Sequence, residues 1–224
     1  MSELLQTVSL AAGYNQAAVV RGLDIEVEPG EVVALLGPNG AGKTTTLMTI
    51  AGFLRPLEGE IRLYSKATSA PAHRRARDGV AFVTEERSVF PRLTAAENLR
   101  VSDGDPEIAM EVFPELRPLL GRLGGNLSGG EQQMLTLGRA LARRPKLLLA
   151  DELSLGLAPL IVRRLLEAVR AAAEEHGTGV LLVEQHVHQA LRYADRVYVL
   201  RRGSVVLAGP VSEIAGRIEE AYLN

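Results

Sequence analysis

The sequence predicts an α/β fold with a mostly parallel sheet that helices cover on both faces. Short continuous apolar runs, typical of fully buried parallel strands, alternate along the chain with helices that carry apolar residues at helical spacing. The clearest of these runs are 32–36 and 147–150. Residues 94–125 interrupt the alternation with a helical pattern, so we expect them to form a lobe of their own.

Composition limits the possible functions. The chain has 224 residues, of which 46% are apolar, so it can bury a sizeable core and is too apolar for intrinsic disorder. It lacks cysteine, which excludes disulfides, thiolate metal sites and a cysteine nucleophile. The 27 acidic residues offset 25 basic ones and aromatic residues are only 4%, which argues against nucleic-acid binding. We expect neither a leader nor a membrane-spanning helix, and therefore a soluble, cytosolic chain that reaches a membrane only through a partner.

The elements before residue 90 follow from short β-type runs and the turn residues between them. A glycine-rich loop at 37–42 leads into a helix that ends before Pro56. The run His73-Arg74-Arg75-Ala76-Arg77 predicts a solvated helix face, because charge clusters of this kind are usually exposed, and a contact to an acidic partner is the alternative. The expected strands are 4–10, 24–27, 32–36, 59–64 and 80–83.

The second half of the chain returns to the alternation after the helical lobe. Asp105-Pro106 is typical of a helix start inside that lobe. A long helix begins at Ser128 and ends at Arg143-Arg144, whose charges suit the negative end of the helix dipole. We then expect a helix at 159–176 and strands at 147–150, 180–183, 197–200 and 204–207.

A phosphate-binding loop lies between the strand at 32–36 and the helix that follows it. Its spacing is Gly-x-x-x-x-Gly-Lys-Thr, and its candidate binding residues are Gly37, Pro38, Asn39, Gly40, Ala41, Gly42, Lys43, Thr44 and Thr45. Glycines let several backbone N–H groups converge on one anion, and the helix N-terminus adds partial positive charge. We expect Lys43 to reach the β- and γ-phosphates of a nucleotide and the Thr44 hydroxyl to bind Mg²⁺. The alternative is a glycine-rich turn that matches by chance, and the flanking strand and helix argue against it.

Two carboxylates, Asp151 and Glu152, follow the buried strand at 147–150. Acids at the end of a buried strand are costly unless something cationic faces them. In a fold with a phosphate loop we expect this strand to lie beside the strand at 32–36. Asp151 would then bind Mg²⁺, directly or through water, and Glu152 would polarise the water that attacks the γ-phosphate. Without the phosphate loop, an exposed acidic pair would be the better interpretation.

A second helix start with anion-binding character lies at 127–133, Leu-Ser-Gly-Gly-Glu-Gln-Gln. One interpretation is a capping box, in which Ser128 caps the helix and Glu131 reaches back to it. The capping box does not explain Gly129 and Gly130, since each glycine weakens a helix by about 1 kcal/mol relative to alanine. Exposed amides at a helix N-terminus bind anions, so this site is available to the nucleotide of another molecule.

The segment 127–133 resembles the signature sequence of ATP-binding-cassette (ABC) ATPases, and the resemblance extends over essentially the whole chain. As in that family, the segment lies between the phosphate loop and the Asp151-Glu152 strand. Several stretches are also similar to one of the two ATPase subunits of bacterial branched-chain amino-acid importers. They are Val89-Phe90-Pro91-Arg92-Leu93-Thr94 with Glu97-Asn98-Leu99, Ser154-Leu155-Gly156-Leu157-Ala158-Pro159, Val183-Glu184-Gln185 and Ala221-Tyr222-Leu223.

The resemblance implies one ABC ATPase domain over residues 1–224. Its parts would be a nucleotide-binding core with a small antiparallel β lobe, formed by 1–85 and 140–224, and a helical lobe at 86–139 that carries the signature. The resemblance also implies that Tyr14 stacks on adenine, a contact worth roughly 1–3 kcal/mol by analogy with base–aromatic stacking. An ordinary half-buried tyrosine at a strand end explains Tyr14 equally well.

The same resemblance implies an arrangement of two subunits. Ser128, Gly129 and Gly130 would contact the γ-phosphate of the ATP that the opposite subunit binds. Two cassettes would then enclose two ATP molecules, and residues 154–158 would cross between the subunits.

Three positions depart from the general cassette pattern. Glu85 stands where a glutamine is usual, and its carboxylate would still meet the metal or the water. Gln185 aligns with the usual switch histidine, and it can offer only a neutral hydrogen bond because glutamine cannot become cationic. The importer subunits look similar at both places, which indicates a subfamily trait; His186 taking over the role by a shift of one residue is the alternative. Leu153 replaces the usual proline after the two acids.

We therefore expect an ATP-hydrolysing subunit of an ABC importer for branched-chain or related amino acids, with ATP and Mg²⁺ as cofactors. Its expected partners are a second ATPase subunit, as homo- or heterodimer, two membrane permeases docked beside residues 85–100, and indirectly a periplasmic or lipid-anchored solute-binding protein. The expected location is the cytoplasmic face of the inner membrane. The alternatives are a soluble ABC ATPase without a transport role, an importer for another polar solute such as urea or amides, and another P-loop enzyme such as a GTPase or small-molecule kinase. The missing Asn-Lys-x-Asp motif and the signature argue against the last of these.

Overall fold

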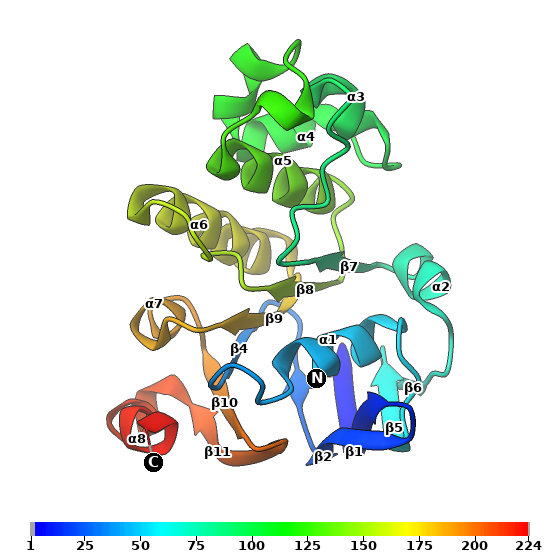
Figure 1. Cartoon of the computed structure of the whole chain (residues 1–224), viewed down its shortest axis with the longest axis vertical. Coiled ribbons are helices and arrows are strands. Elements are labelled where there is room, and N and C mark those ends of the chain that lie inside the picture. Colours follow the sequence, from blue (N-terminus) through cyan, green and yellow to red (C-terminus); the bar gives the residue numbers. More distant parts are fainter. Residues whose placement is uncertain (1–2, 224) are drawn as a thin grey trace.

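The central feature of the structure, a computed structural model that describes residues 3–223, is a six-stranded sheet (Figure 1). For residues 219–223 only the backbone is described, so the side chains of Ala221-Tyr222-Leu223 lie outside the described part. The strand order is β11-β10-β4-β9-β8-β7, and all neighbours are parallel except the antiparallel pair of β10 and β11. The predicted, mostly parallel sheet is confirmed. Its strands are β4 (Val32–Leu36), β7 (Val80–Val83), β8 (Leu147–Asp151), β9 (Gly179–Glu184), β10 (Arg196–Arg201) and β11 (Ser204–Pro210).

Both faces of this sheet are buried, which explains why its strands read as continuous apolar runs. Successive side chains point to opposite faces, so Leu147 and Leu149 pack on one side while Leu148 and Ala150 pack on the other. The first side is covered by α1 (Lys43–Ala51) and the β lobe (Figure 1). The second side is covered by the helices α5 (Gly129–Leu141), α6 (Pro159–His176), α7 (Val187–Leu191) and α8 (Val211–Leu223).

A second, antiparallel sheet forms the small β lobe, which confirms that part of the predicted fold. Its strand order is β2-β1-β5-β6, and β3 pairs with β1. The strand β2 was missed in the sequence, where Arg21 and Gly22 interrupt its apolar pattern. It joins β1 through a tight turn in which Asn15 and Gln16 both have positive φ, the geometry that hairpin turns of two residues require. The strands are β1 (Leu5–Tyr14), β2 (Ala17–Leu23), β3 (Glu26–Val27), β5 (Glu58–Leu63) and β6 (Lys66–Ala67).

The helical lobe lies at one end of the molecule, at the top of Figure 1. It contains α3 (Ala95–Arg100), α4 (Pro106–Val112) and two 3-10 turns before α5. The helical sequence pattern at 94–125 therefore corresponds to several short helices. The buried side chain of Asn98 organises the segment that enters this lobe. It accepts a hydrogen bond from the Phe90 N–H and donates to the carbonyls of Phe90, Leu93 and Thr94.

The prediction of a solvated helix face at 73–77 holds for α2 (Ala72–Arg77) except at one arginine. His73, Arg74 and Arg77 are exposed, but Arg75 is only 2% exposed. Its guanidinium donates hydrogen bonds to the carbonyls of Ala70, Thr49 and Ile50, and the last two lie at the C-terminal end of α1. The negative end of that helix attracts a cation inward, although burial lowers the pKa of Arg75.

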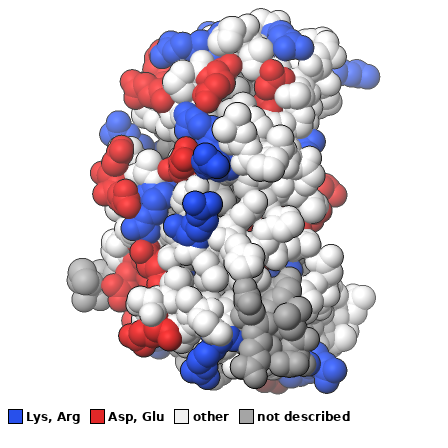
Figure 2. Space-filling view, turned by 90° about the vertical axis from the view of Figure 1, so that its left-hand side faces the viewer, with Lys and Arg blue, Asp and Glu red and all other residues white. Residues whose placement is uncertain are grey.

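The surface over α6 carries charges of both signs. Figure 2 shows basic and acidic side chains interspersed on this face of the molecule. Several of them are paired, such as Arg170 with Glu174 and Asp195.

None of the helices in the described part of the chain is both long and apolar enough to cross a membrane.

Candidate active site

The loop after β4 is built to receive an anion. Gly42 occupies the N-cap of α1 with φ of 106°, and no side chain caps this helix end, so its first amides are left for another acceptor. A Cβ on Gly42 would lie 2.2 Å from Val20 Cγ1, so only glycine fits there. Lys43 follows directly, and its Nζ donates to the carbonyl oxygens of Gly37 at 2.9 Å and Pro38 at 3.3 Å. The ammonium group therefore lies across the loop, where a phosphate would compete for it.

The two predicted carboxylates lie at the end of β8 and face this loop. We expected β8 to be the direct neighbour of β4. That prediction was wrong, because β9 lies between the two. The side chains nevertheless bridge the gap, since Lys43 Nζ is 3.6 Å from Glu152 Oε1. Both partners are nearly buried, so the contact is weakly screened.

Asp151 has the chemistry of a metal ligand. It is 1% exposed, and its Oδ1 has no hydrogen-bond partner among the described residues. Burial raises its pKa to about 6, and the nearby charges of Glu152 and Glu85 add to the rise, while a hydrogen bond with the Thr44 side chain opposes it. A buried carboxylate oxygen without a partner, beside a hydroxyl, fits a hard cation such as Mg²⁺.

The protein side of such a metal site is incomplete by itself. Within the described residues, no group of three or more His, Asp or Glu side chains is arranged to hold a metal ion. Mg²⁺ commonly takes only one or two protein carboxylates and fills its remaining positions with phosphate oxygens and water. Asp151 and Thr44 would therefore hold the ion together with a phosphate, with the exposed Glu85 close enough to act through its charge.

Glu152 is fixed in an unusual backbone conformation. Its φ is 48°, in the left-handed region that costs a non-glycine residue roughly 1–3 kcal/mol. Its N–H donates to the Val183 carbonyl at 2.9 Å, and its Oε2 accepts from Gln185 Nε2 at 2.6 Å. The carboxylate is thus held between the amide of Gln185 and the ammonium of Lys43, at the opening of the phosphate loop.

The structure separates the two candidates for the switch position. Gln185 contacts Glu152 and lines the same cavity, whereas His186, the N-cap residue of α7, is exposed and does not line it. The cavity measures about 400 Å³. Its walls are formed by Val19, Asn39, Gly40, Gly42, Lys43, Thr44, Thr45, Glu85, Glu152, Leu155 and Gln185.

Tyr14 is not brought into this cavity. Its ring is 47% exposed at the end of β1, and its hydroxyl lies 3.8 Å from the Met48 sulfur on the phosphate-loop helix. Val19 and Leu155, by contrast, line the cavity and were not predicted. Val19 belongs to β2, the missed strand, whereas Leu155 lies in the loop 154–158 that was expected at the subunit interface and not in the phosphate cavity.

The signature segment forms the predicted capping box. Ser128 Oγ accepts from the Glu131 N–H at 3.3 Å, and Glu131 Oε2 accepts from the Ser128 N–H at 2.6 Å. A Cβ on Gly129 would lie 2.8 Å from the guanidinium of Arg87, which the sequence did not single out. None of residues 128–130 lines the phosphate cavity of its own chain. The signature segment therefore lies outside the phosphate cavity of its own subunit.

Comparison with known proteins agrees with this geometry. The model of the ABC transporter family matches residues 20–154, which include the phosphate loop, the signature and both carboxylates. This chain belongs to the ABC transporter family. As an ABC ATPase it hydrolyses ATP as part of a transporter, and ABC ATPases work as dimers with membrane permeases. The predicted family and enzyme class are confirmed.

Individual relatives cover 94–100% of this ABC ATPase. The high-affinity branched-chain amino acid transport ATP-binding protein BraG of Pseudomonas aeruginosa is 41% identical, over 94% of this chain and 95% of that protein. The lipopolysaccharide export system ATP-binding protein LptB of Acidithiobacillus ferridurans is 39% identical, over 100% and 98%. A solved ATP-binding subunit of an ABC transporter superimposes with a TM-score of 0.83 at 30% identity, over 96% and 93%.

Proposed function

We propose that this ABC ATPase powers the import of branched-chain or related amino acids. The identity to BraG supports this assignment, while the nearly equal identity to LptB leaves a lipopolysaccharide exporter as the second candidate. The stretches 89–99 and 154–159, and Gln185 at the switch position, are similar to the importer subunits and favour import.

The cluster of Lys43, Glu152 and Gln185 is the observation that carries the proposed chemistry. The loop amides and Lys43 bind the β- and γ-phosphates, since both are aimed at the opening of the loop. Glu152 orients and polarises the attacking water, because its carboxylate is held at that opening by two donors. Gln185 donates a neutral hydrogen bond toward the γ-phosphate. Asp151 and Thr44, with Glu85 nearby, would hold Mg²⁺, which would neutralise charge on the phosphates.

A second subunit completes this site. Leu155 lines the cavity and is 44% exposed, so the loop 154–158 would be within reach of a partner there. Ser128, Gly129 and Gly130 of the opposite cassette would close that side, each ATP being bound by both chains. Nucleotide binding would then drive closure, because the closed state gains contacts that the open state lacks.

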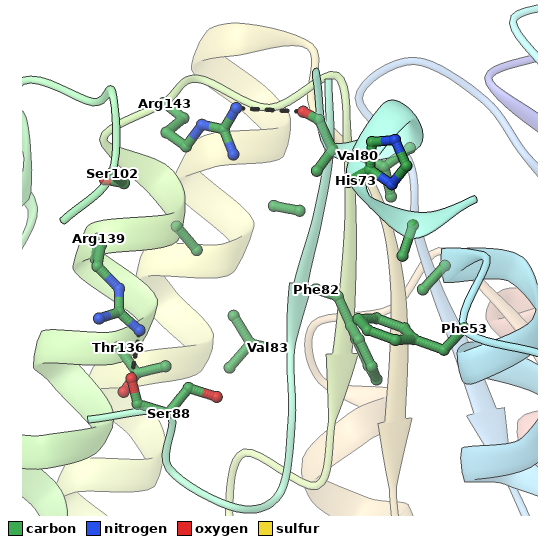
Figure 3. Close-up of a pocket in the computed structure, with 15 residues that line it drawn as sticks. Phe53, His73, Val80, Phe82, Val83, Ser88, Ser102, Thr136, Arg139 and Arg143 are labelled. Carbon is green, nitrogen blue, oxygen red and sulfur yellow. Dashed lines mark hydrogen bonds between the residues drawn. The ribbon is translucent and has the colours of Figure 1, made fainter. Parts of the chain in front are cut away.

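A groove between the core and the helical lobe supports docking of a permease beside residues 85–100. It measures about 400 Å³, and Figure 3 shows Phe53 and Phe82 on its core side and Thr136 and Arg139 on its α5 side. Phe53 is 61% exposed and its ring centroid lies 5.9 Å from that of Phe82, which gives an apolar contact surface. A segment seated there would contact both lobes and would move when they close. The proposed location is the cytoplasmic face of the inner membrane, with two permeases and a periplasmic or lipid-anchored solute-binding protein completing the importer.

The substitution Glu152→Gln tests the proposed chemistry. The variant should bind ATP normally, lose turnover by about 100-fold or more, and accumulate as an ATP-bound dimer on size-exclusion chromatography. Glu175→Gln, an exposed acid on α6, is the matched control and should hydrolyse ATP at the normal rate. Normal turnover in Glu152→Gln would remove this residue from its role.

The substrate needs a separate experiment. The ATPase is co-purified with its membrane subunits, reconstituted in vesicles with the solute-binding protein, and assayed with leucine, isoleucine and valine against urea and lipopolysaccharide. Stimulation by the amino acids alone supports the assignment, and stimulation by lipopolysaccharide would establish the exporter in its place.

A further inference from the structure

We infer that Glu184, at the end of β9, is a positioning residue that fixes both the turn carrying Glu152 and the start of the loop 154–158. This inference rests on the proposed roles of Glu152 and of that loop. Glu184 does not line the phosphate cavity, so it would act through Ser154 and not on the nucleotide.

Two hydrogen bonds tie Glu184 to Ser154. Ser154 Oγ donates to Glu184 Oε2 at 2.5 Å, and the Ser154 N–H donates to Glu184 Oε1 at 3.2 Å. Glu184 is 0% exposed and Ser154 is 6% exposed, so water does not compete for either contact. Both carboxylate oxygens therefore accept from Ser154 of the neighbouring turn, and the Gln185 N–H also bonds to this carboxylate.

Packing alone does not account for a carboxylate at this place. The rest of β9 is apolar, and Glu184 sits in register beside Leu36 of β4. A fully buried acid costs free energy that an aliphatic side chain would avoid, and Glu152 nearby adds repulsion. What the carboxylate provides, and a leucine could not, is a pair of acceptors for the backbone and side chain of Ser154.

The pair lies next to a second contact between the same two segments. Gln185 donates to Glu152, and the adjacent Glu184 accepts from Ser154, two residues beyond Glu152. Glu184 and Gln185 thus hold the turn after β8 at two points, Ser154 and Glu152. This double attachment explains how Glu152 is kept at φ of 48°, and it sets the direction in which Leu155 leaves toward a partner subunit. A movement of Gln185 on contact with a γ-phosphate would reach the loop through the same attachment.

The test compares Glu184→Ala, Ser154→Ala, their double variant and Glu184→Gln in steady-state ATP hydrolysis. We expect each alanine variant to lower kcat by about tenfold to a hundredfold, as misplacement of a catalytic group does, with KM for ATP changed less than about twofold. The double variant should be no slower than either single one, because both remove the same interaction. Glu184→Gln should recover to within about threefold, since its amide can accept from the Ser154 N–H and donate to its hydroxyl.

Thr178→Ala is the matched control, because it removes a buried hydroxyl bond to Pro145 at the other end of β9. It should be destabilised without loss of kcat. The same alanine substitutions in the Glu152→Gln background should also weaken ATP-dependent dimerisation on size-exclusion chromatography.

The possible failures are distinguishable. A kcat within twofold of wild type in Ser154→Ala, additive losses in the double variant, or Glu184→Gln as slow as Glu184→Ala would each overturn the positioning role. If Glu184→Ala does not fold, Ser154→Ala and Glu184→Gln still decide. Normal turnover of Glu152→Gln itself would instead remove the proposed function on which the inference rests.

Discussion

The burial of Glu184 makes a quantitative prediction about stability. Replacing it with glutamine keeps the shape and the hydrogen bonds to Ser154 but removes the ionisable group. Burial raises the pKa of Glu184 to about 7 from an ordinary value of 4.5, and the charge of Glu152 adds to the rise. In the folded protein this carboxyl therefore holds its proton to higher pH than it does in the unfolded chain.

The sign and size of the effect follow from proton linkage. Between about pH 4.5 and 7 the folded state binds more protons than the unfolded state, so the free energy of unfolding of the wild type falls as pH rises. A difference of 2.5 pKa units at 1.36 kcal/mol each corresponds to about 3 kcal/mol, fully lost above the folded pKa. The variant Glu184→Gln does not lose this stability as pH rises. The free energy of unfolding of the variant minus that of the wild type should therefore increase by about 3 kcal/mol from pH 4 to pH 8.

Urea denaturation at pH 4.5, 6, 7 and 8, with both proteins free of nucleotide, measures this difference. Asp151 and the other carboxyls titrate in the wild type and in Glu184→Gln alike. The difference in unfolding free energy between the two proteins therefore reports on Glu184 alone. A difference in unfolding free energy that stays constant across this range would refute the reasoning, because it would mean that folding does not raise the pKa of Glu184. A change in the slope with urea would indicate that the substitution altered more than the ionisation.

Three further predictions concern other parts of the site and the fold. Lys43→Ala should weaken ATP binding by about 2–3 kcal/mol, roughly 30- to 150-fold by calorimetry, because a charge-assisted contact is lost; unchanged affinity would mean that the loop amides alone hold the phosphates. Tyr14→Ala should weaken ATP binding by about 1–3 kcal/mol because the stacking ring is lost, while Tyr14→Phe keeps the ring and should bind ATP like the wild type. If Tyr14→Ala binds ATP as tightly as the wild type, Tyr14 is an ordinary strand-end residue. Arg75→Met should lower the free energy of unfolding by about 3 kcal/mol through loss of three carbonyl contacts, while the exposed Arg74→Met stays within about 0.5 kcal/mol; similar values for the two would contradict the buried role of Arg75.

The parts of this molecule that sequence predicts well are those governed by local rules. The phosphate loop follows from glycine spacing between a strand and a helix, and the capping box of Ser128 and Glu131 follows from their separation along one helix turn. The central strands follow from burial on both faces. Each of these signals lies within about ten residues of the chain.

What sequence did not reveal depends on contacts between distant segments. Arg75 looked like one of several exposed arginines, and only the position of the α1 C-terminus makes it a buried cation. The insertion of β9 between β4 and β8 is a property of topology, which adjacent residues do not encode. Glu184 carried a weak signal, a single acid ending an apolar strand, but its partner Ser154 lies 30 residues earlier.

Asp151, Glu152 and Glu184 are three buried acids close together, and their mutual repulsion costs free energy. We link that cost to function. Burial raises the pKa of both Asp151 and Glu184, the charge of Glu152 adds to both rises, and Lys43 opposes the rise at Asp151. A protein selected for stability alone would have little use for three carboxylates at the ends of two adjacent strands. Under the proposed function, a divalent cation beside Asp151 would relieve part of this repulsion, and a second subunit would contact the loop that follows Glu152. We therefore expect the site to be most stable when it is filled and closed, the state in which the proposed ATPase would act on a partner.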